Sequence, residues 1–323
     1  MIQKDAFVDT LLKHNMEIAF FSEMGFTGKV PRTYTNMRTE FAWMCKLNAD
    51  HYNLATLPDK SYDLGLVLNS KKSPELLDIT AIKTKCRRVG ILQEGPFWYF
   101  QDYILNNQVH YFNNLIAADA IYVHNEQDKA YYKGLTDHPD VRVLRSLMIE
   151  DPISSITSPE ERSGVMIGGN FKSWYGGFDS FMLAKSVTDE IYSPQMGRRQ
   201  EGEEQLGITQ LPYLEWNQWI SELSKRRIGI HMMRTHAAGT FAMNCSYLGI
   251  PCIGYEGLDT QRILHPELTV VDGDLETARK LINKLHNDKE FYMLCSDSTK
   301  LLYKEHYHED QFNSTFKEQF KVS

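Results

Sequence analysis

The stretch from Ile228 to Gly254, IGIHMMRTHAAGTFAMNCSYLGIPCIG, contains residues suited to binding a diphosphate. Arg234 supplies a fixed positive charge, and His236 supplies a titratable hydrogen-bond donor two residues later. Gly239 and Thr240 follow at the predicted start of a helix, where backbone N–H groups without intrahelical partners point outward. The pattern indicates a phosphate-binding loop between a strand and a helix. The alternative is an ordinary loop whose small residues serve packing alone.

A second glycine turn, Gly168-Gly169-Asn170, follows the apolar run 164–167. Backbone amides at Gly169, the Asn170 side chain and nearby Lys172 could together bind phosphate. Neither a complete dinucleotide-binding fingerprint nor a P-loop is present, so the turn does not indicate a nicotinamide cofactor.

Two carboxylates come directly after predicted strands. Glu94, in Gln-Glu-Gly-Pro, follows the apolar run 88–92, and Glu23 closely follows the run 17–21. The carboxyl ends of parallel strands are where α/β proteins bind ligands, so Glu94 is the first candidate for a catalytic carboxylate and Glu23 the second. The alternative for Glu94 is a simple turn residue.

Three further residues are candidates for binding a ligand. Trp98 belongs to the aromatic cluster 97–100, which is either hydrophobic packing or a stacking platform for a base or sugar. His124 ends the run 120–123, and Arg38 lies near the start of a predicted helix, where it could face a ligand or solvent.

Basic residues gather on connecting segments. The candidates for contacting phosphates are Lys85, Arg87 and Arg88, with further basic residues at Lys71, Lys72, Lys83, Arg198 and Arg199. Such groups are usually solvated faces. The net charge of −7 argues against a protein that coats nucleic acid, although affinity for phosphate depends on local patches.

Short apolar runs alternate with helix-compatible segments along the whole chain, and this alternation predicts an α/β fold with parallel sheets. Residues 151–163 contain two prolines and four serines, which is typical of a linker. We therefore expect a first domain over 1–150, a second over 164–305, and a C-terminal helix over 306–323 that packs back on the first.

Composition narrows the class of protein. The chain has 323 residues and is 42% hydrophobic, with no run approaching the ~20 apolar residues of a membrane span, so we expect a cytoplasmic protein. We also expect it to be a monomer. Its five cysteines are dispersed without C-x-x-C spacing, which argues against a disulfide framework or zinc site. No acidic metal cluster is visible, and no cofactor or metal is expected.

The region from Gly164 to Tyr307 resembles the nucleotide-sugar-binding half of GT-B glycosyltransferases. The resemblance rests on the Gly-Gly-Asn turn and on GTFAMNCSYLGIPCIG. It implies two Rossmann-like domains facing a cleft and a nucleotide-diphosphate sugar, expected to be a UDP-sugar, as donor. Retaining members carry two glutamates eight positions apart. His236 and Asn244 occupy those positions here, and an asparagine can still bond a donor hydroxyl.

A narrower resemblance concerns the acceptor. The segments IGGNFKSWYGGFDSF (167–181) and STFKEQF (314–320) are similar to parts of the T-even bacteriophage DNA α-glucosyltransferases, which modify 5-hydroxymethylcytosine. The resemblance implies double-stranded modified DNA as the acceptor, and a bacteriophage protein acting in the host cytoplasm.

Together these observations predict a glycosyltransferase that moves a hexose or pentose from a nucleotide-diphosphate sugar to a hydroxyl. Cationic groups and amides near Arg234 and Lys172 would counter the charge of the departing diphosphate. Three alternatives remain: a glycan- or lipid-directed transferase, a nucleotide-sugar 2-epimerase of the same fold, and a non-catalytic module that binds nucleotide sugar or DNA.

Overall fold

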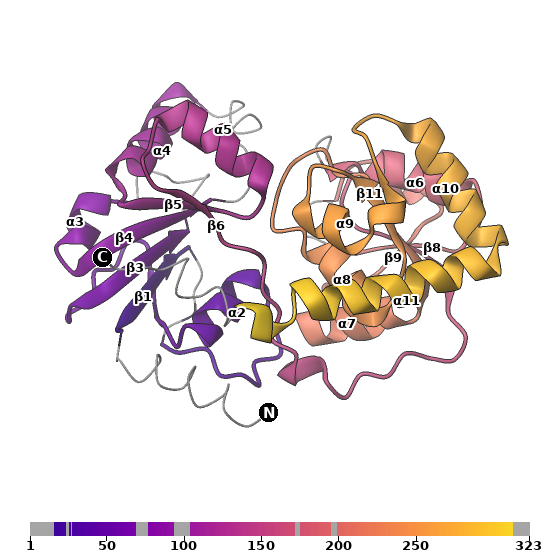
Figure 1. Ribbon diagram of the computed structural model, residues 1–323, viewed down its shortest axis with the longest axis horizontal. Coiled ribbons are helices and arrows are strands. Elements are labelled where there is room, and N and C mark those ends of the chain that lie inside the picture. Colours follow the sequence, from indigo (N-terminus) through magenta and orange to yellow (C-terminus); the bar gives the residue numbers. More distant parts are fainter. Residues whose placement is uncertain are drawn as a thin grey trace. The chain divides into compact units, whose positions relative to one another are not determined.

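The computed structural model describes residues 16–23, 26, 28–68, 77–93, 104–171, 175–194 and 199–312 (Figure 1). The chain forms two compact units. The first unit comprises Met1–Arg32, Glu40–Arg145 and Glu309–Ser323, and the second comprises Thr33–Thr39 and Ser146–His308. The segment 151–163, expected as a linker, belongs to the second unit.

The first unit is built on a parallel sheet of six strands in the order β2-β1-β3-β4-β5-β6. Its strands are β1 (Ile18–Ser22), β2 (Asp50–Asn53), β3 (Tyr62–Leu68), β4 (Cys86–Gln93), β5 (Ala120–Val123) and β6 (Val141–Val143). The central strands are apolar along most of their length because both faces of the sheet are covered. The predicted parallel sheet is confirmed in this unit.

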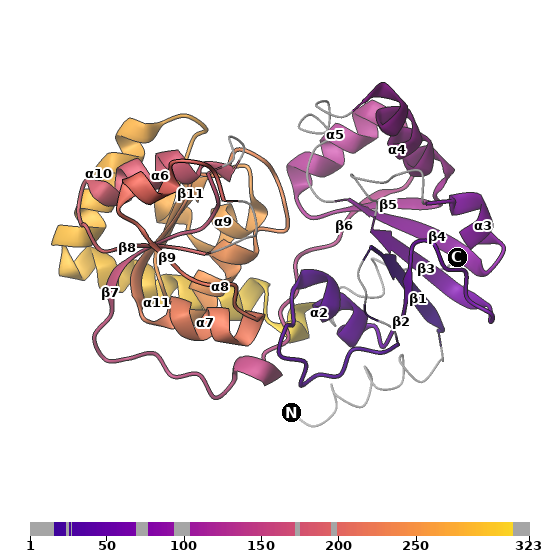
Figure 2. The same cartoon turned by 180° about the vertical axis from the view of Figure 1, so that it is seen from behind.

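Helices lie on both faces of the first sheet. They are α2 (Thr39–Lys46), α3 (Ile79–Lys83), α4 (Leu105–Ala117) and α5 (Glu126–Thr136). Helices α4 and α5 cover one face and α2 lies on the other (Figure 2). The core on the α4 side joins the strand residues Phe21, Val67 and Ile91 to Tyr111 and Tyr132 of the helices.

The second unit repeats the plan, with strand order β12-β11-β10-β7-β8-β9 and all pairs parallel. Its strands are β7 (Ser163–Ile167), β8 (Ile191–Ser193), β9 (Thr209–Gln210), β10 (Arg226–His231), β11 (Cys252–Tyr255) and β12 (Thr269–Val270). Its α-helices are α6 (Gly177–Lys185), α7 (Trp216–Ser224), α8 (Thr240–Leu248), α9 (Asp259–Leu264), α10 (Leu275–Asn287) and α11 (Lys289–His306). The short 3-10 helices are η3 (Asp151–Ile153), η5 (Glu203–Leu206) and η6 (Pro266–Leu268).

Helices α6 and α10 cover one face of the second sheet, and α7, α8 and α11 lie at the other (Figures 1 and 2). Apolar side chains of α6 and α10 pack on the sheet, for example Phe181 and Ile282 on Ile167 and Ile230. Among the described residues, no helix is long and apolar enough to cross a membrane.

Candidate functional site

The carboxyl edge of the second sheet gathers the residues predicted to bind phosphate. Strands β7 and β10 are neighbours and pair Ile167 with Ile230, so the glycine turn after β7 and the loop after β10 leave the sheet at the same edge. The turn contains Gly169, and the loop contains Arg234 and leads to Gly239, the residue before α8. The structure therefore brings Gly169, Arg234 and Gly239 to one edge.

The glycine turn lies tightly against the start of α8. A side chain at Gly168 would place its Cβ only 2.6 Å from the ring of Phe241, the second residue of α8. A Cβ at Gly169 would lie 2.8 Å from the Tyr175 carbonyl oxygen and 3.5 Å from His231 Nε2. A larger residue at Gly168 would push the turn away from α8, and one at Gly169 would crowd Tyr175 and His231.

Helix α8 begins without a side-chain cap. Its N-cap, Gly239, has φ of 65°, in the left-handed region, and a Cβ there would lie 1.9 Å from Thr260 Oγ1. The first turn of α8 contains no acidic residue, whereas the first turn of α6 contains Asp179. The free N–H groups and partial positive charge at the start of α8 are therefore not balanced by an acidic side chain of the helix itself, which suits an anion.

Arg234 is the fixed cation of this edge. Its guanidinium lies 3.6 Å from the Asp179 carboxylate and 3.4 Å from the Asp272 carboxylate, and its side chain is 48% exposed. The neighbouring Tyr255 hydroxyl raises the pKa of Arg234, and the two carboxylates add to that effect. These long ion pairs hold the arginine over the edge while leaving it accessible to a phosphate.

The remaining predicted donor-binding residues surround the same helix start. His236 lies beside Gly257, where a Cβ would be 2.4 Å from its Nε2. Thr240 opens α8 half-buried, and Asn244 is buried one turn later. Asn170 is buried in the glycine turn, and Lys172 lies outside the described residues.

Two buried polar groups at this edge were missed by the sequence analysis. His231 ends β10, and neither of its ring nitrogens has a hydrogen-bond partner within the described part of the chain. Thr260 Oγ1, beside Gly239, likewise has none. The signal in the sequence is a histidine at the end of an otherwise apolar strand, but its lack of a partner depends on packing.

The carboxyl edge of the first sheet carries a separate set of candidates. Gln93 ends β4, is 1% exposed, and has no partner for either amide atom among the described residues. Glu23 follows β1 and is exposed. His124 follows β5 but is only 3% exposed, because its ring stacks on Trp43 at 5.1 Å, which turns it into the interior. Glu94 and Trp98 lie outside the described residues.

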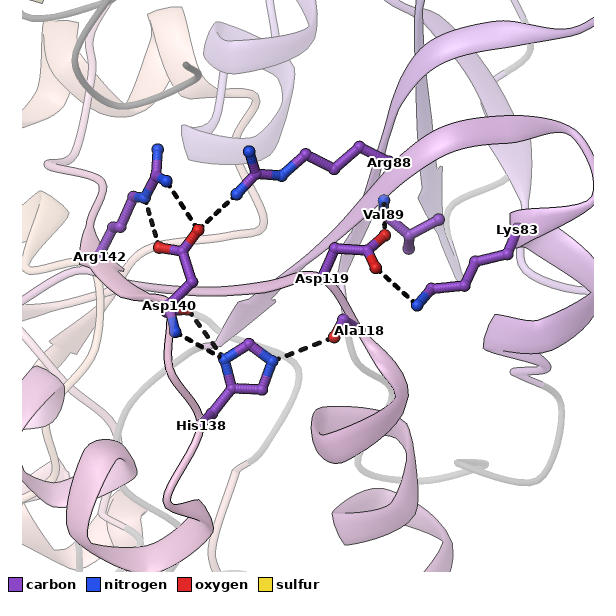
Figure 3. Close-up of polar contacts among 8 residues, drawn as sticks. All are labelled: Lys83, Arg88, Val89, Ala118, Asp119, His138, Asp140 and Arg142. Carbon is purple, nitrogen blue, oxygen red and sulfur yellow. Dashed lines mark hydrogen bonds and ion pairs between the residues drawn. The ribbon is translucent and has the colours of Figure 1, made fainter. Parts of the chain in front are cut away.

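The basic residues Lys85, Arg87 and Arg88 lie at the opposite, amino edge of that sheet, around the start of β4. Arg88 is bound to the carboxylate of Asp140, which also accepts hydrogen bonds from Arg142 (Figure 3). The structure therefore does not bring these three residues together with Gln93, Glu23 or His124. Lys71, Lys72 and Arg198 lie outside the described residues.

Neighbouring groups hold this amino edge together. Lys83 Nζ lies 2.7 Å from Asp119, whose other oxygen accepts the Val89 N–H (Figure 3). His138 Nε2 lies 3.1 Å from the Ala118 carbonyl, to which it must donate, and its Nδ1 accepts the Asp140 N–H at 3.1 Å. Several basic side chains of this edge thus form ion pairs that stabilise the packing of β4, β5 and β6.

Arg38 belongs to the second unit rather than to the first, where it was expected. Its guanidinium donates to Tyr213 Oη at 2.7 Å and to Asn36 Oδ1 at 3.1 Å. Asn36 Oδ1 also accepts the N–H of Trp216, the first residue of α7, at 3.2 Å. These contacts attach the segment 33–39 to the start of α7.

No group of three His, Cys, Asp or Glu side chains that could hold a metal ion occurs among the residues described. The five cysteines, all within the described ranges, form no disulfide.

Comparisons with known proteins identify solved structures that share this fold. No protein-family model matches the chain, and no curated protein matches it in sequence. The solved structure of HepE from Anabaena with UDP and glucose has a TM-score of 0.70 at 11% identity, over 96% of this chain and 100% of that one. Sucrose-phosphate synthase from Thermosynechococcus elongatus has a TM-score of 0.68 at 12% identity, over 94% of this chain and 98% of that one.

A structure of trehalose-6-phosphate synthase matches with a TM-score of 0.64 at 8% identity, over 100% of this chain and 98% of that one. These similar structures are GT-B glycosyltransferases. Similarity at such low identity shows the fold, and the predicted GT-B fold of two parallel α/β sheets is confirmed.

Proposed function

We propose that this chain is a glycosyltransferase whose donor is a UDP-sugar bound at the carboxyl edge of the second sheet. The observation that carries the proposal is the convergence of Arg234, the Gly169 turn and the uncapped start of α8 at that edge. Support also comes from the similar HepE structures, which contain UDP and glucose or UDP-glucose.

In this proposal, Arg234 and the N–H groups at Thr240 and Phe241 bind the diphosphate. These groups would stabilise the diphosphate most in the transition state, when negative charge develops on it as it leaves. Stabilisation at that point accelerates sugar transfer. Asn170 and Lys172 would add contacts from the glycine turn. His236 and Asn244 would bind donor hydroxyls in place of the two glutamates of retaining relatives.

The acceptor hydroxyl is proposed to bind at the carboxyl edge of the first sheet. Glu94 directly follows the buried Gln93 at the end of β4, and Glu23 follows β1. A carboxylate within hydrogen-bond reach of the acceptor hydroxyl could orient it or take its proton.

We propose two classes of acceptor. The sequence resemblance to phage enzymes suggests 5-hydroxymethylcytosine in double-stranded DNA, with exposed Arg87 as a candidate phosphate contact. A sugar or glycan hydroxyl is the alternative. It is favoured by the pairing of Arg88 with Asp140, and by the similar structures named as sucrose-phosphate synthase and trehalose-6-phosphate synthase.

One experiment tests both the activity and the acceptor. Purified protein is incubated with UDP-glucose, UDP-N-acetylglucosamine or UDP-xylose carrying a labelled sugar, together with hydroxymethylated duplex, unmodified duplex or sugar phosphates. Label in the hydroxymethylated duplex alone supports the DNA acceptor, and label in a sugar product supports the alternative. Free isomerised sugar would indicate an epimerase, and binding without turnover a non-catalytic module. Absence of any UDP-sugar binding would overturn the proposal.

A further inference from the structure

His231 is a buried histidine at the end of β10. It is 7% exposed, and burial lowers the pKa of its ring to about 4. Neither Nδ1 nor Nε2 has a hydrogen-bond partner within the described ranges. Buried polar groups in folded proteins are nearly always hydrogen-bonded, so this residue requires an explanation.

The surroundings of His231 connect it to the proposed donor site. Its ring meets the ring of Phe241, in the first turn of α8, nearly edge to face at 5.3 Å and 66°. On another side, Nε2 lies 3.5 Å from the position that a Cβ would take at Gly169. The imidazole therefore lies between the glycine turn and the start of α8, the two backbone elements that the proposed function assigns to the diphosphate.

A second buried histidine in the same unit shows how such a ring is normally accommodated. Burial also lowers the pKa of His265 to about 4. Its Nε2, however, lies 3.0 Å from the Ala242 carbonyl oxygen, and its Nδ1 lies 3.3 Å from the Cys252 backbone nitrogen. Burial alone thus does not leave a histidine of this unit without partners.

Thr260 provides an independent observation on the other side of the helix start. Its hydroxyl is buried against Gly239 and has no hydrogen-bond partner among the described residues. His231 and Thr260, two polar groups without partners in the described ranges, therefore flank the N-terminus of α8. Together they indicate that this end of the helix receives polar groups of a ligand in addition to an anion.

The chemistry of the ring selects the kind of group that it can bind. With a pKa near 4, His231 is uncharged at neutral pH and offers one N–H donor and one acceptor nitrogen. A phosphate oxygen can only accept a hydrogen bond, whereas a hydroxyl group both donates and accepts. Arg234 and the helix N–H groups already provide the charge that a phosphate requires.

We propose that His231 binds a hydroxyl group of the nucleotide sugar, either on its ribose or on the sugar to be transferred. The inference rests on the proposed function and adds hydroxyl recognition to the same site. It assigns a role to a residue whose ring nitrogens have no hydrogen-bond partner in the part of the chain that the structure describes.

The test compares stability and binding in His231→Phe, which keeps the ring shape and removes both nitrogens. Because these nitrogens have no partner among the described residues, the thermal midpoint of His231→Phe is expected to be unchanged or higher. Its affinity for UDP-glucose in calorimetry is expected to fall about tenfold, the loss of one well-made hydrogen bond. His231→Gln restores a hydrogen-bonding group near Nε2 and should recover part of the affinity.

His265→Phe is the matched control, because it removes ring nitrogens that are hydrogen-bonded and should lower the thermal midpoint. A fall in the midpoint of His231→Phe as large as that of His265→Phe would show a structural role and overturn the inference. Unchanged affinity for both UDP-glucose and UDP would also overturn it.

Three ligands distinguish the source of the hydroxyl. Weakening of UDP-glucose alone assigns the contact to the transferred sugar, and weakening of UDP as well assigns it to the ribose. Equal weakening of pyrophosphate would mean a phosphate contact and would reject hydroxyl recognition. If the unaltered protein binds neither UDP nor UDP-glucose, the proposed function fails. If it binds them and His231→Phe binds equally well, only the present inference fails.

Discussion

The guanidinium of Arg32 binds the carboxylate of Glu309 through two hydrogen bonds of 2.8 and 2.7 Å, although the two residues are 277 positions apart. Lys46 donates to the same carboxylate at 2.5 Å. Glu309 belongs to the first unit, as do Arg32 and Lys46, although it closely follows α11 of the second unit. The chain thus returns to its first unit at a defined ion-pair cluster.

This cluster predicts a pH-dependent contribution to stability. Burial alone would raise the pKa of Glu309, but hydrogen bonds from Arg32 and Lys46 outweigh it and lower the pKa from 4.5 to about 2. Because the folded pKa is below the unfolded value, the contribution is fully present above pH 4.5 and is lost as pH falls through 2.

Glu309→Gln should therefore lower the free energy of unfolding by about 1–3 kcal/mol at pH 7. Its stability and that of the parent protein should converge as pH falls toward 2. Urea denaturation across pH provides the measurement. Glu305→Gln, at a carboxylate that is 70% exposed, is the control and should change little. A constant difference at every pH would contradict the assignment.

Gly239→Ala should damage the start of α8 by two effects. The residue has φ of 65°, and its Cβ would lie 1.9 Å from Thr260 Oγ1. Gly207 has the same φ with nothing within 4 Å of its Cβ position, so Gly207→Ala isolates the backbone strain, which costs about 1–2 kcal/mol. Thermal denaturation should show a larger loss for Gly239→Ala, and only this variant should lose UDP affinity. Equal losses would show that the contact with Thr260 relaxes freely.

Arg234→Ala should weaken UDP binding about tenfold or more, because it removes a charge-assisted contact with the diphosphate. The affinity is measured by calorimetry. Arg279→Ala, an exposed arginine on α10, is the charge-matched control and should bind UDP normally. Unchanged affinity in Arg234→Ala would remove this residue from the proposed donor site.

Glu94→Gln keeps the shape of the side chain and removes its charge. If Glu94 acts on the acceptor hydroxyl, turnover should fall while the affinity for UDP-glucose remains unchanged. Steady-state kinetics and calorimetry on the same preparation separate the two effects. Full turnover would identify Glu94 as a turn residue and make Glu23→Gln the next variant.

Lys85→Ala combined with Arg87→Ala tests the DNA acceptor without disturbing the pairing of Arg88 with Asp140. If both side chains contact phosphates, the slope of log affinity against log salt should flatten by about two, since each contact contributes ~0.9 for duplex DNA. Gel-shift titrations over a salt series measure it, and UDP affinity serves as the internal control. If the parent protein binds no duplex at low salt, the sugar or glycan acceptor is favoured.

The order of apolar runs and loops in the sequence determined much of this protein. Strand β10, the glycine at 239 and helix α8 are local features, because a buried strand, a left-handed cap and a helix each have recognisable residue types. The sequence also determines at which edge of the sheet a flanking residue lies, because residues before and after a strand lie at opposite edges. Lys85 and Gln93 are therefore separated by their places around β4.

Other features depend on contacts between residues far apart in the sequence, and only the tertiary structure shows them. Strand β2, with the sequence Asp-His-Tyr-Asn, has no apolar run and forms by pairing with β1 at the edge of the sheet. Arg38 belongs to the second unit and donates a hydrogen bond to Tyr213, which is 175 positions away. His231 and His265 are alike in burial, yet only packing gives His265 its partners and leaves His231 without any in the described structure. Whether a buried polar atom is hydrogen-bonded depends on residues brought close by the fold, and for this reason the sequence alone could not identify His231.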